Sequence, residues 1–322
     1  MKNTKEKVKL DEILKFLFST SNKVLINLLN AIFDEDFKEN EVELTVSNNE
    51  FIEDTLGVIR GDMFFDILKK DHNKVSYHLE FQTKNDNTMV VRMFEYGFKK
   101  GKENSNVKID DNIKTIYFPK QKVIFFEENK SIEDLLNLKI VFPDSQEVIY
   151  SVGVIKYWEL TPEYLSEKKM YPLMPLQLFT LRKELESAQR RNDISKIQEL
   201  SVVAKDLAEM LANKSSDLFY REEILGEDFH KMLLAIQNLI EYLNRNYLHD
   251  EKLEEEVITM TKSLYDPAVE RKGIEQGIKK GTMDTKIENA KNLLDILDDE
   301  TIAVKIGLDI DIVKKLRKES LS

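Results

Sequence analysis

Residues 60–82 read RGDMFFDILKKDHNKVSYHLEFQ, and this stretch decides the fold. An apolar run after Asp62 is followed by a polar turn at Asp71–Lys74 and then by a second run with Glu80, a pattern that predicts a β-hairpin. The numbers 62 and 80 sum to 142, twice 71, so antiparallel pairing centred near Asp71 places Asp62 nearly opposite Glu80. Directly opposed residues have Cβ atoms roughly 4.5–5.5 Å apart. Two carboxylates at that range repel unless a partner such as a divalent cation lies between them.

The alternation of side chains along a strand groups the polar residues of this hairpin. His78, Glu80 and Gln82 share one face of the second strand, and Asp62 and Asp66 share one face of the first. Acidic side chains inside apolar strands are costly to bury unless they are paired or bound to a metal. The pattern therefore favours a functional site on this face.

Oxygen ligands suit a hard cation such as Mg²⁺, which takes carboxylates, backbone carbonyls and water. Asp62, Glu80 and the backbone carbonyl of Phe81 form a candidate set of this kind. Spacing alone leaves two alternatives open. In one, the hairpin is a sheet edge and both acids are solvated at its rim. In the other, Asp66 replaces Asp62 as the first ligand.

The rest of the N-terminal half predicts a mixed α/β core. Residues 10–33 have helical spacing with a break near 19–21, residues 41–46 alternate as a strand, and residues 88–100 return to a helical pattern. Further strands are expected within 114–128 and 147–158.

Charged amphipathic helices follow from Pro162, with predicted segments at 175–191, 195–212 and 227–248. We therefore divide the chain into a core over 1–160, a helical region over 161–270 and a charged helical tail over 271–322. The tail ends in two short helical patterns around Gly307, which either resemble a helix-turn-helix or serve for docking or oligomerisation.

Composition limits the class of protein. The chain has 322 residues and no cysteine, which excludes disulfides and thiolate metal sites and fits a reducing cytoplasm. No apolar run approaches the roughly 20 residues that span a bilayer, so no membrane partner is expected. The net charge of −11 disfavours a protein that coats nucleic acid, but it leaves room for an enzyme with a local basic groove.

Three motifs together resemble the recombination-promoting nuclease (Rpn) and putative transposase family of the PD-(D/E)XK superfamily. They are Asp62-Met63-Phe64-Phe65, His78-Leu79-Glu80-Phe81-Gln82 and Arg92-Met93-Phe94-Glu95-Tyr96. The opening residues 11–18 look like the first helix of that family, and the glycines at 273 and 277 look like part of its C-terminal extension.

The resemblance implies a restriction-endonuclease-like mixed-sheet core flanked by helices, and cleavage of DNA phosphodiesters that depends on Mg²⁺ or Mn²⁺. Carried over by position, Asp62 and Glu80 match the two acidic metal ligands. Gln82 stands where the superfamily has a lysine, although glutamine is common in this branch. Glutamine can orient a water molecule through its amide but brings no positive charge.

Two functions follow as expectations. The first is a metal-dependent deoxyribonuclease with Asp62, Glu80 and Gln82 in catalysis, whose helical C-terminal region docks on a second copy or on DNA. The second is a catalytically weak or inactive DNA-binding protein that retains the fold. Arg92 and Tyr96 lie four residues apart on one helix face. Three alternatives stay open for them: they contact DNA phosphate, they brace Glu80, or they belong to a solvated or packed face. His78 is expected to border the site or to lie on the strand surface.

Overall fold

The structure is a computed structural model that describes residues 10–53, 59–83, 87–104, 115–265 and 267–320. The described residues form two compact units. The first reaches Ile224 and continues over Asp228–Leu264, and the second comprises Leu225–Glu227 and the residues from Tyr265 onward. The described parts of the predicted core and helical region thus lie almost wholly in one unit.

A six-stranded mixed sheet forms the centre of the first unit, and it confirms the predicted mixed α/β class. The spatial order is β1-β2-β3-β4-β6-β5, with β1, β2 and β3 antiparallel, β4 parallel to β3, β6 parallel to β4, and β5 antiparallel to β6. The strands are β1 Val42–Glu53, β2 Ile59–Lys69, β3 Lys74–Gln82, β4 Lys120–Phe125, β5 Leu135–Val141 and β6 Glu147–Lys156. Strands β2 and β3 match the predicted hairpin within one residue at each end. Strand β5 was not predicted.

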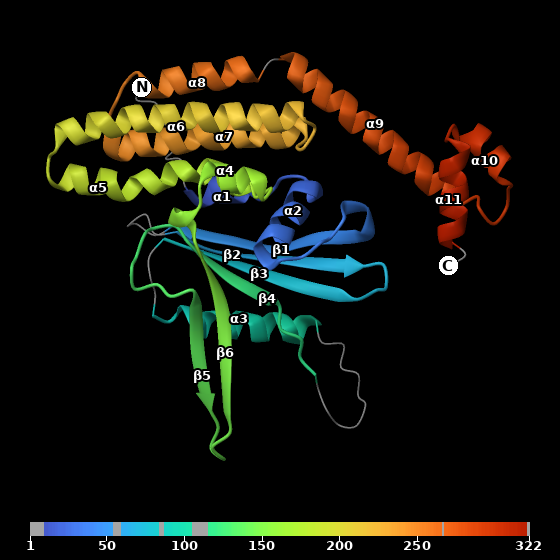
Figure 1. Ribbon diagram of the computed structural model, residues 1–322, viewed down its shortest axis with the longest axis horizontal. Helices are drawn as coiled ribbons and strands as arrows, with labels where there is room; N and C mark the ends of the chain where they lie inside the picture. Colours follow the sequence, from blue (N-terminus) through green and yellow to red (C-terminus); the bar gives the residue numbers. More distant parts are fainter. Residues whose placement is uncertain (1–9, 54–58, 84–86, 105–114, 266, 321–322) are drawn as a thin grey trace, which may run out of the picture. The chain divides into compact units, whose positions relative to one another are not determined.

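Helices cover both faces of the sheet (Figure 1). Helices α1 (Leu10–Leu17) and α2 (Asn22–Phe33) lie on one face, and α3 (Met89–Asn104) lies on the other. The break between the first two helices confirms the predicted interruption near 19–21. Successive side chains of β3 point to opposite faces of the sheet. Tyr77, Leu79 and Phe81 are buried beneath α1 and α2, and the ring of Phe81 lies 5.0 Å from that of Phe18.

A layer of helices lies beyond α1 and α2 (Figure 1). Its members are α4 Pro162–Glu167, α5 Arg182–Arg190, α6 Ile194–Tyr220, α7 Gly226–Leu243 and α8 Leu253–Leu264, together with short 3-10 or π segments at Tyr171–Leu181 and Asn244–Leu248. Two further 3-10 turns, Glu39–Glu41 before β1 and Tyr157–Glu159 after β6, adjoin the sheet. The helix predicted over 175–191 is α-helical only from Arg182. The preceding turns, Tyr171–Leu181, are 3-10 and contain Pro175.

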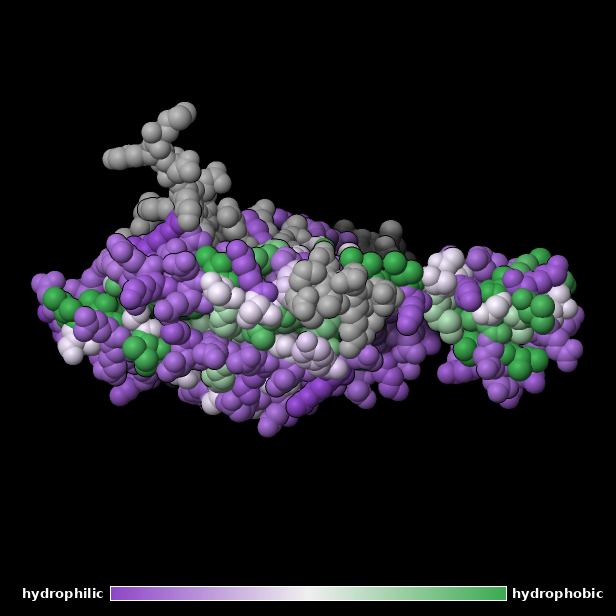
Figure 2. Space-filling view, turned by 90° about the horizontal axis from the view of Figure 1, so that it is seen from above, coloured by the Kyte–Doolittle hydropathy of each residue, from purple (hydrophilic) through white to green (hydrophobic). Residues whose placement is uncertain are grey.

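Polar contacts attach this helical layer to the rest of the first unit. Asp228 accepts hydrogen bonds from the backbone N–H and the hydroxyl of Ser21, both at 2.7 Å, and thereby fixes the start of α2. Arg182, which is buried, pairs with Glu127 just beyond β4 at 2.8 Å. The visible surface in Figure 2 is mostly hydrophilic with small separate hydrophobic areas, as expected for a chain with 33% charged residues.

The second unit consists of α9 (Pro267–Lys291), α10 (Asp299–Ile306) and α11 (Ile310–Ser320). Asp298 caps α10 by accepting from the N–H of Thr301, and Gly307 ends it at a φ of 68°, a conformation that favours glycine. The helices enclose a small core of Ala290, Leu294, Ile302, Leu308, Val313 and Leu316. Among the described residues, no helix is long and apolar enough to cross a membrane.

Candidate functional site

The β2–β3 hairpin has the register predicted from the residue numbers. Asp62 pairs directly with Glu80, and Asp66 pairs with Ser76. The turn between the strands is stabilised by Asp71, whose carboxylate accepts from the N–H of Asn73 at 3.0 Å. Because antiparallel register is fixed by the turn, this local hydrogen bonding determines which acids face each other.

Burial contradicts the interpretation of the hairpin as a solvated sheet edge. Strand β3 lies between β2 and β4, and β1 covers the outer side of β2. The Glu80 side chain is completely buried, while Asp62 retains 23% exposure. Both acids therefore lie on an interior face, with Asp62 toward its accessible side.

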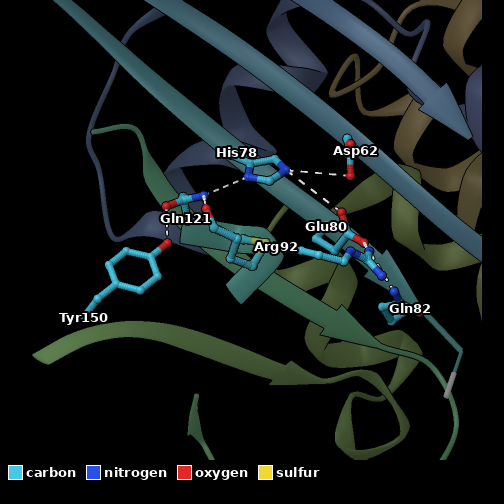
Figure 3. Close-up of polar contacts among 8 residues, drawn as sticks. Asp62, His78, Glu80, Gln82, Arg92, Gln121 and Tyr150 are labelled. Carbon is cyan, nitrogen blue, oxygen red and sulfur yellow. Dashed lines mark hydrogen bonds and ion pairs between the residues drawn. The ribbon is translucent and has the colours of Figure 1, made fainter. Parts of the chain in front are cut away.

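His78 completes a cluster with the two acids (Figure 3). Sequence reasoning had placed His78 only at the border of the site. Its Nε2 lies 3.9 Å from Asp62 Oδ1 and 4.0 Å from Glu80 Oε2. One potential ligand atom from each residue lies within 4.8 Å of the other two, so the group is able to hold a metal ion. Among the described residues, neither His78 Nε2 nor Glu80 Oε2 has a hydrogen-bond partner, although both atoms are buried.

The two carboxyl groups differ in proton affinity. Burial raises the pKa of Glu80 well above its ordinary value, and Asp62 raises it further, while Arg92 only partly opposes this. Burial also acts to raise the pKa of Asp62, but its interactions with His78, Glu80 and Arg92 outweigh burial and lower the pKa. Asp62 therefore ionises first, and Glu80 keeps its proton to higher pH. A cation held between them would displace that proton.

The other oxygen of Glu80 is occupied by donors. Arg92 Nη2 contacts Glu80 Oε1, and Gln82 Nε2 donates to the same oxygen at 3.3 Å. This confirms the expectation that Arg92 braces Glu80. Gln82 is 1% exposed, so its amide is directed to the carboxylate rather than to solvent. Together these donors orient Glu80 so that Oε2 faces Asp62 and His78.

Tyr96 and Lys100 follow Arg92 at intervals of four residues on α3, and both also contact residues of the hairpin. The ring of Tyr96 meets His78 edge-on, with centroids 5.8 Å apart. One turn further on, Lys100 pairs with Asp66 at 3.0 Å, and Lys74 pairs with the same carboxylate at 3.1 Å. Asp66 is thus held by two lysines and lies outside the metal-capable cluster. The geometry favours Asp62 over Asp66 as the first ligand.

The remaining ligand in the predicted set is the backbone carbonyl of Phe81. The Phe81 side chain lies on the opposite face of the sheet, and its backbone pairs in register with Gly61 on one side and Ile124 on the other. Ligation by this carbonyl stays a prediction.

Sequence reasoning missed three residues that surround His78. Gln121 on β4 lies opposite His78, with Gln121 Nε2 2.9 Å from His78 Nδ1, and the Tyr150 hydroxyl donates to Gln121 Oε1. The ring of Phe64 stacks on the imidazole at 4.1 Å and 8°. A glutamine within the apolar run KQKVIFF was the available signal, but its partner 43 residues away depends on the parallel β3–β4 register.

Comparisons with protein-family models, with curated proteins and with solved structures found no match.

Proposed function

We propose that this protein is a metal-dependent DNA endonuclease that hydrolyses phosphodiester bonds. The observation that supports it best is the directly opposed pair Asp62–Glu80, with a buried oxygen of Glu80 that has no partner among the described residues. The six-stranded mixed sheet with helices on both faces agrees with the restriction-endonuclease-like core that the resemblance to the Rpn family implies.

The residues present fit a divalent cation. Asp62 Oδ1 and Glu80 Oε2 are the oxygens that would hold Mg²⁺ or Mn²⁺, because both are directed into the same space and Oε2 is otherwise unsatisfied. A cation bound there would activate water and offset the charge that develops on a phosphodiester oxygen. Water attacks phosphorus in line with the leaving sugar oxygen, whose bond to phosphorus breaks.

Arg92 and Gln82 serve the reaction through Glu80. Their two contacts to Oε1 hold the carboxylate in one rotamer, so that Oε2 stays directed toward Asp62. Arg92 keeps 20% of its side chain exposed and supplies a positive charge beside the site. A charged group in this position also suits an approaching DNA phosphate.

One observation favours the second candidate, a DNA-binding protein with little or no cleavage. The Gln82 amide, which stands in the lysine position, is buried against Glu80 and is not free to hold an attacking water. If no other group takes that role, the chain binds DNA without cutting it efficiently.

Plasmid nicking separates the two candidates. We expect the purified chain to nick supercoiled DNA with Mg²⁺ or Mn²⁺ and to stop when EDTA is added, whereas Glu80→Gln and Asp62→Asn abolish nicking. Glu103→Gln is the matched control, since Glu103 lies exposed on α3. Nicking that survives both site substitutions refutes the site. A salt-dependent gel shift without nicking supports the second candidate.

A further inference from the structure

A partly buried chain of hydrogen bonds leads from Tyr150 through Gln121 to His78 (Figure 3). Gln121 Nε2 lies 2.8 Å from the backbone carbonyl of Met93. A carbonyl oxygen only accepts, so the Gln121 atom that faces it must be the NH₂ group. The Tyr150 hydroxyl donates to the other end of the amide, Gln121 Oε1, which agrees with this orientation.

The orientation of Gln121 fixes the proton on His78. The same NH₂ group lies 2.9 Å from His78 Nδ1 and has a second hydrogen for it. Nδ1 must then accept a hydrogen bond. A neutral imidazole with an accepting Nδ1 has its proton on Nε2.

The ring is held in this orientation from both sides. Phe64 stacks on one face at 4.1 Å, and Tyr96 meets the ring edge-on. His78 is completely buried, so a half-turn of the ring that exchanges the two nitrogens would require its neighbours to move. The Nε2–H group therefore points at Asp62 and Glu80.

We propose that His78 is a hydrogen-bond donor and not a metal ligand, and that its Nε2–H group holds the attacking water beside Asp62 and Glu80. Metal ligation requires a lone pair on Nε2, which the proton occupies. The separations of 3.9 and 4.0 Å are too long for direct hydrogen bonds to the carboxylates, so the Nε2–H group reaches them only through a water molecule beside them.

Two consequences follow. The protein ligands of the cation are oxygens only, which favours a hard cation such as Mg²⁺. His78 also takes the water-orienting role that Gln82 does not fill, because Gln82 donates to Glu80. Gln121 and Tyr150 are positioning residues that act through His78. The position of the proton is independent of the proposed nuclease function, whereas the role given to the water rests on it.

Long-range proton–nitrogen NMR of the full chain labelled with ¹⁵N-histidine tests the tautomer directly. The chain has four histidines, and His78→Gln assigns the signals by their loss. We expect the His78 proton on Nε2, both without metal and with saturating Mg²⁺. A proton on Nδ1, or loss of the Nε2 proton when Mg²⁺ is added, overturns the proposal.

Gln121→Glu provides the opposite tautomer in a chain that retains His78. At a pH where the new carboxyl is ionised, it replaces an NH₂ group by an oxygen without hydrogen, so this oxygen accepts from Nδ1–H and leaves a lone pair on Nε2. We expect the proton to move to Nδ1 and Zn²⁺ affinity to rise relative to Mg²⁺. Tyr150→Phe is the control, because the Met93 carbonyl still fixes the amide and the proton stays on Nε2. A wild-type tautomer in Gln121→Glu contradicts the relay.

The role of the water has a separate readout. His78→Gln, checked for folding by circular dichroism, should lower the kcat of nicking by about 10²-fold or more with KM little changed, as is typical for loss of one transition-state donor. An unchanged kcat overturns this role. A wild-type chain that has the Nε2 proton but never nicks DNA refutes the proposed function, including the role of the water, and leaves the donor assignment supported.

Discussion

Arg92→Met should destabilise the first unit in a way that depends on Glu80 and on pH. Arg92 contacts Glu80 Oε1, and the Glu80 side chain is completely buried. Methionine keeps the apolar length of the arginine stem but leaves an ionised Glu80 without its cation. The loss is therefore the cost of an uncompensated buried charge rather than of a surface ion pair.

The structure sets the magnitude. Removing one partner of a buried pair costs about 3–5 kcal/mol, and we expect the lower end because Arg92 is 20% exposed. At a pH above the folded pKa of Glu80 the expected loss is thus about 3 kcal/mol. At a pH below that pKa it falls to about 1 kcal/mol, the value of one hydrogen bond, because the carboxyl takes up a proton.

Urea unfolding in EDTA measures this loss. Trp158 is the only tryptophan, and it packs against the core cluster of Val123 and Phe125, so its fluorescence reports the first unit. Arg190→Met is the matched control, since Arg190 pairs with Glu186 at 2.6 Å in an exposed helix and should cost about 0.3–0.5 kcal/mol at either pH.

A double-mutant cycle with Glu80→Gln decides the cause. With a neutral partner, Arg92→Met should cost about 1 kcal/mol on either side of the Glu80 pKa, which leaves a coupling of about 2 kcal/mol above it. Equal losses in the two backgrounds, or a loss in wild type that does not change with pH, refute the reasoning that Arg92 compensates a buried charge on Glu80.

The same urea transitions test three further predictions. The folded pKa of Glu80 is raised, so its contribution to stability is complete below the ordinary glutamate pKa of 4.5 and is lost as the pH rises through the folded pKa. Glu80→Gln should therefore gain stability relative to wild type with rising pH, and a constant difference contradicts this sign. Mg²⁺ at a hundredfold excess over Kd should stabilise wild type by about 2.7 kcal/mol, whereas Asp62→Asn should gain nothing. Asp66→Asn leaves the buried Lys100 without its carboxylate and should cost about 1–3 kcal/mol, yet keep the Mg²⁺ effect; loss of that effect would return Asp66 to the metal site.

Local sequence determined the hairpin and the residues that face each other across it. The polar turn at Asp71–Lys74 and the alternation on either side are sufficient to specify the register, because antiparallel neighbours are connected directly. The opposition of Asp62 and Glu80 followed from residue numbers alone. The helix with Arg92 was similarly evident from its own periodicity.

Weaker or interrupted patterns were harder to interpret. Residues 135–141 read LLNLKIV, and this mostly apolar run does not show the alternation that predicts a strand. In the structure they alternate between exposed and half-buried positions as strand β5, which pairs with β6. Residues 171–181, which contain Pro175, form 3-10 turns over part of a predicted α-helix.

The sequence by itself thus determined that two acids oppose each other on a β-hairpin. Only the tertiary structure decided that they are buried, that Arg92 and Gln82 occupy one oxygen of Glu80, and that His78 joins them. The reason is physical. The burial of the acids and the contacts of His78 depend on β4 and β6. Gln121 on β4 reaches His78, and Tyr150 on β6 reaches Gln121. Parallel pairing joins these strands across segments far apart in the chain, and no local periodicity specifies that register.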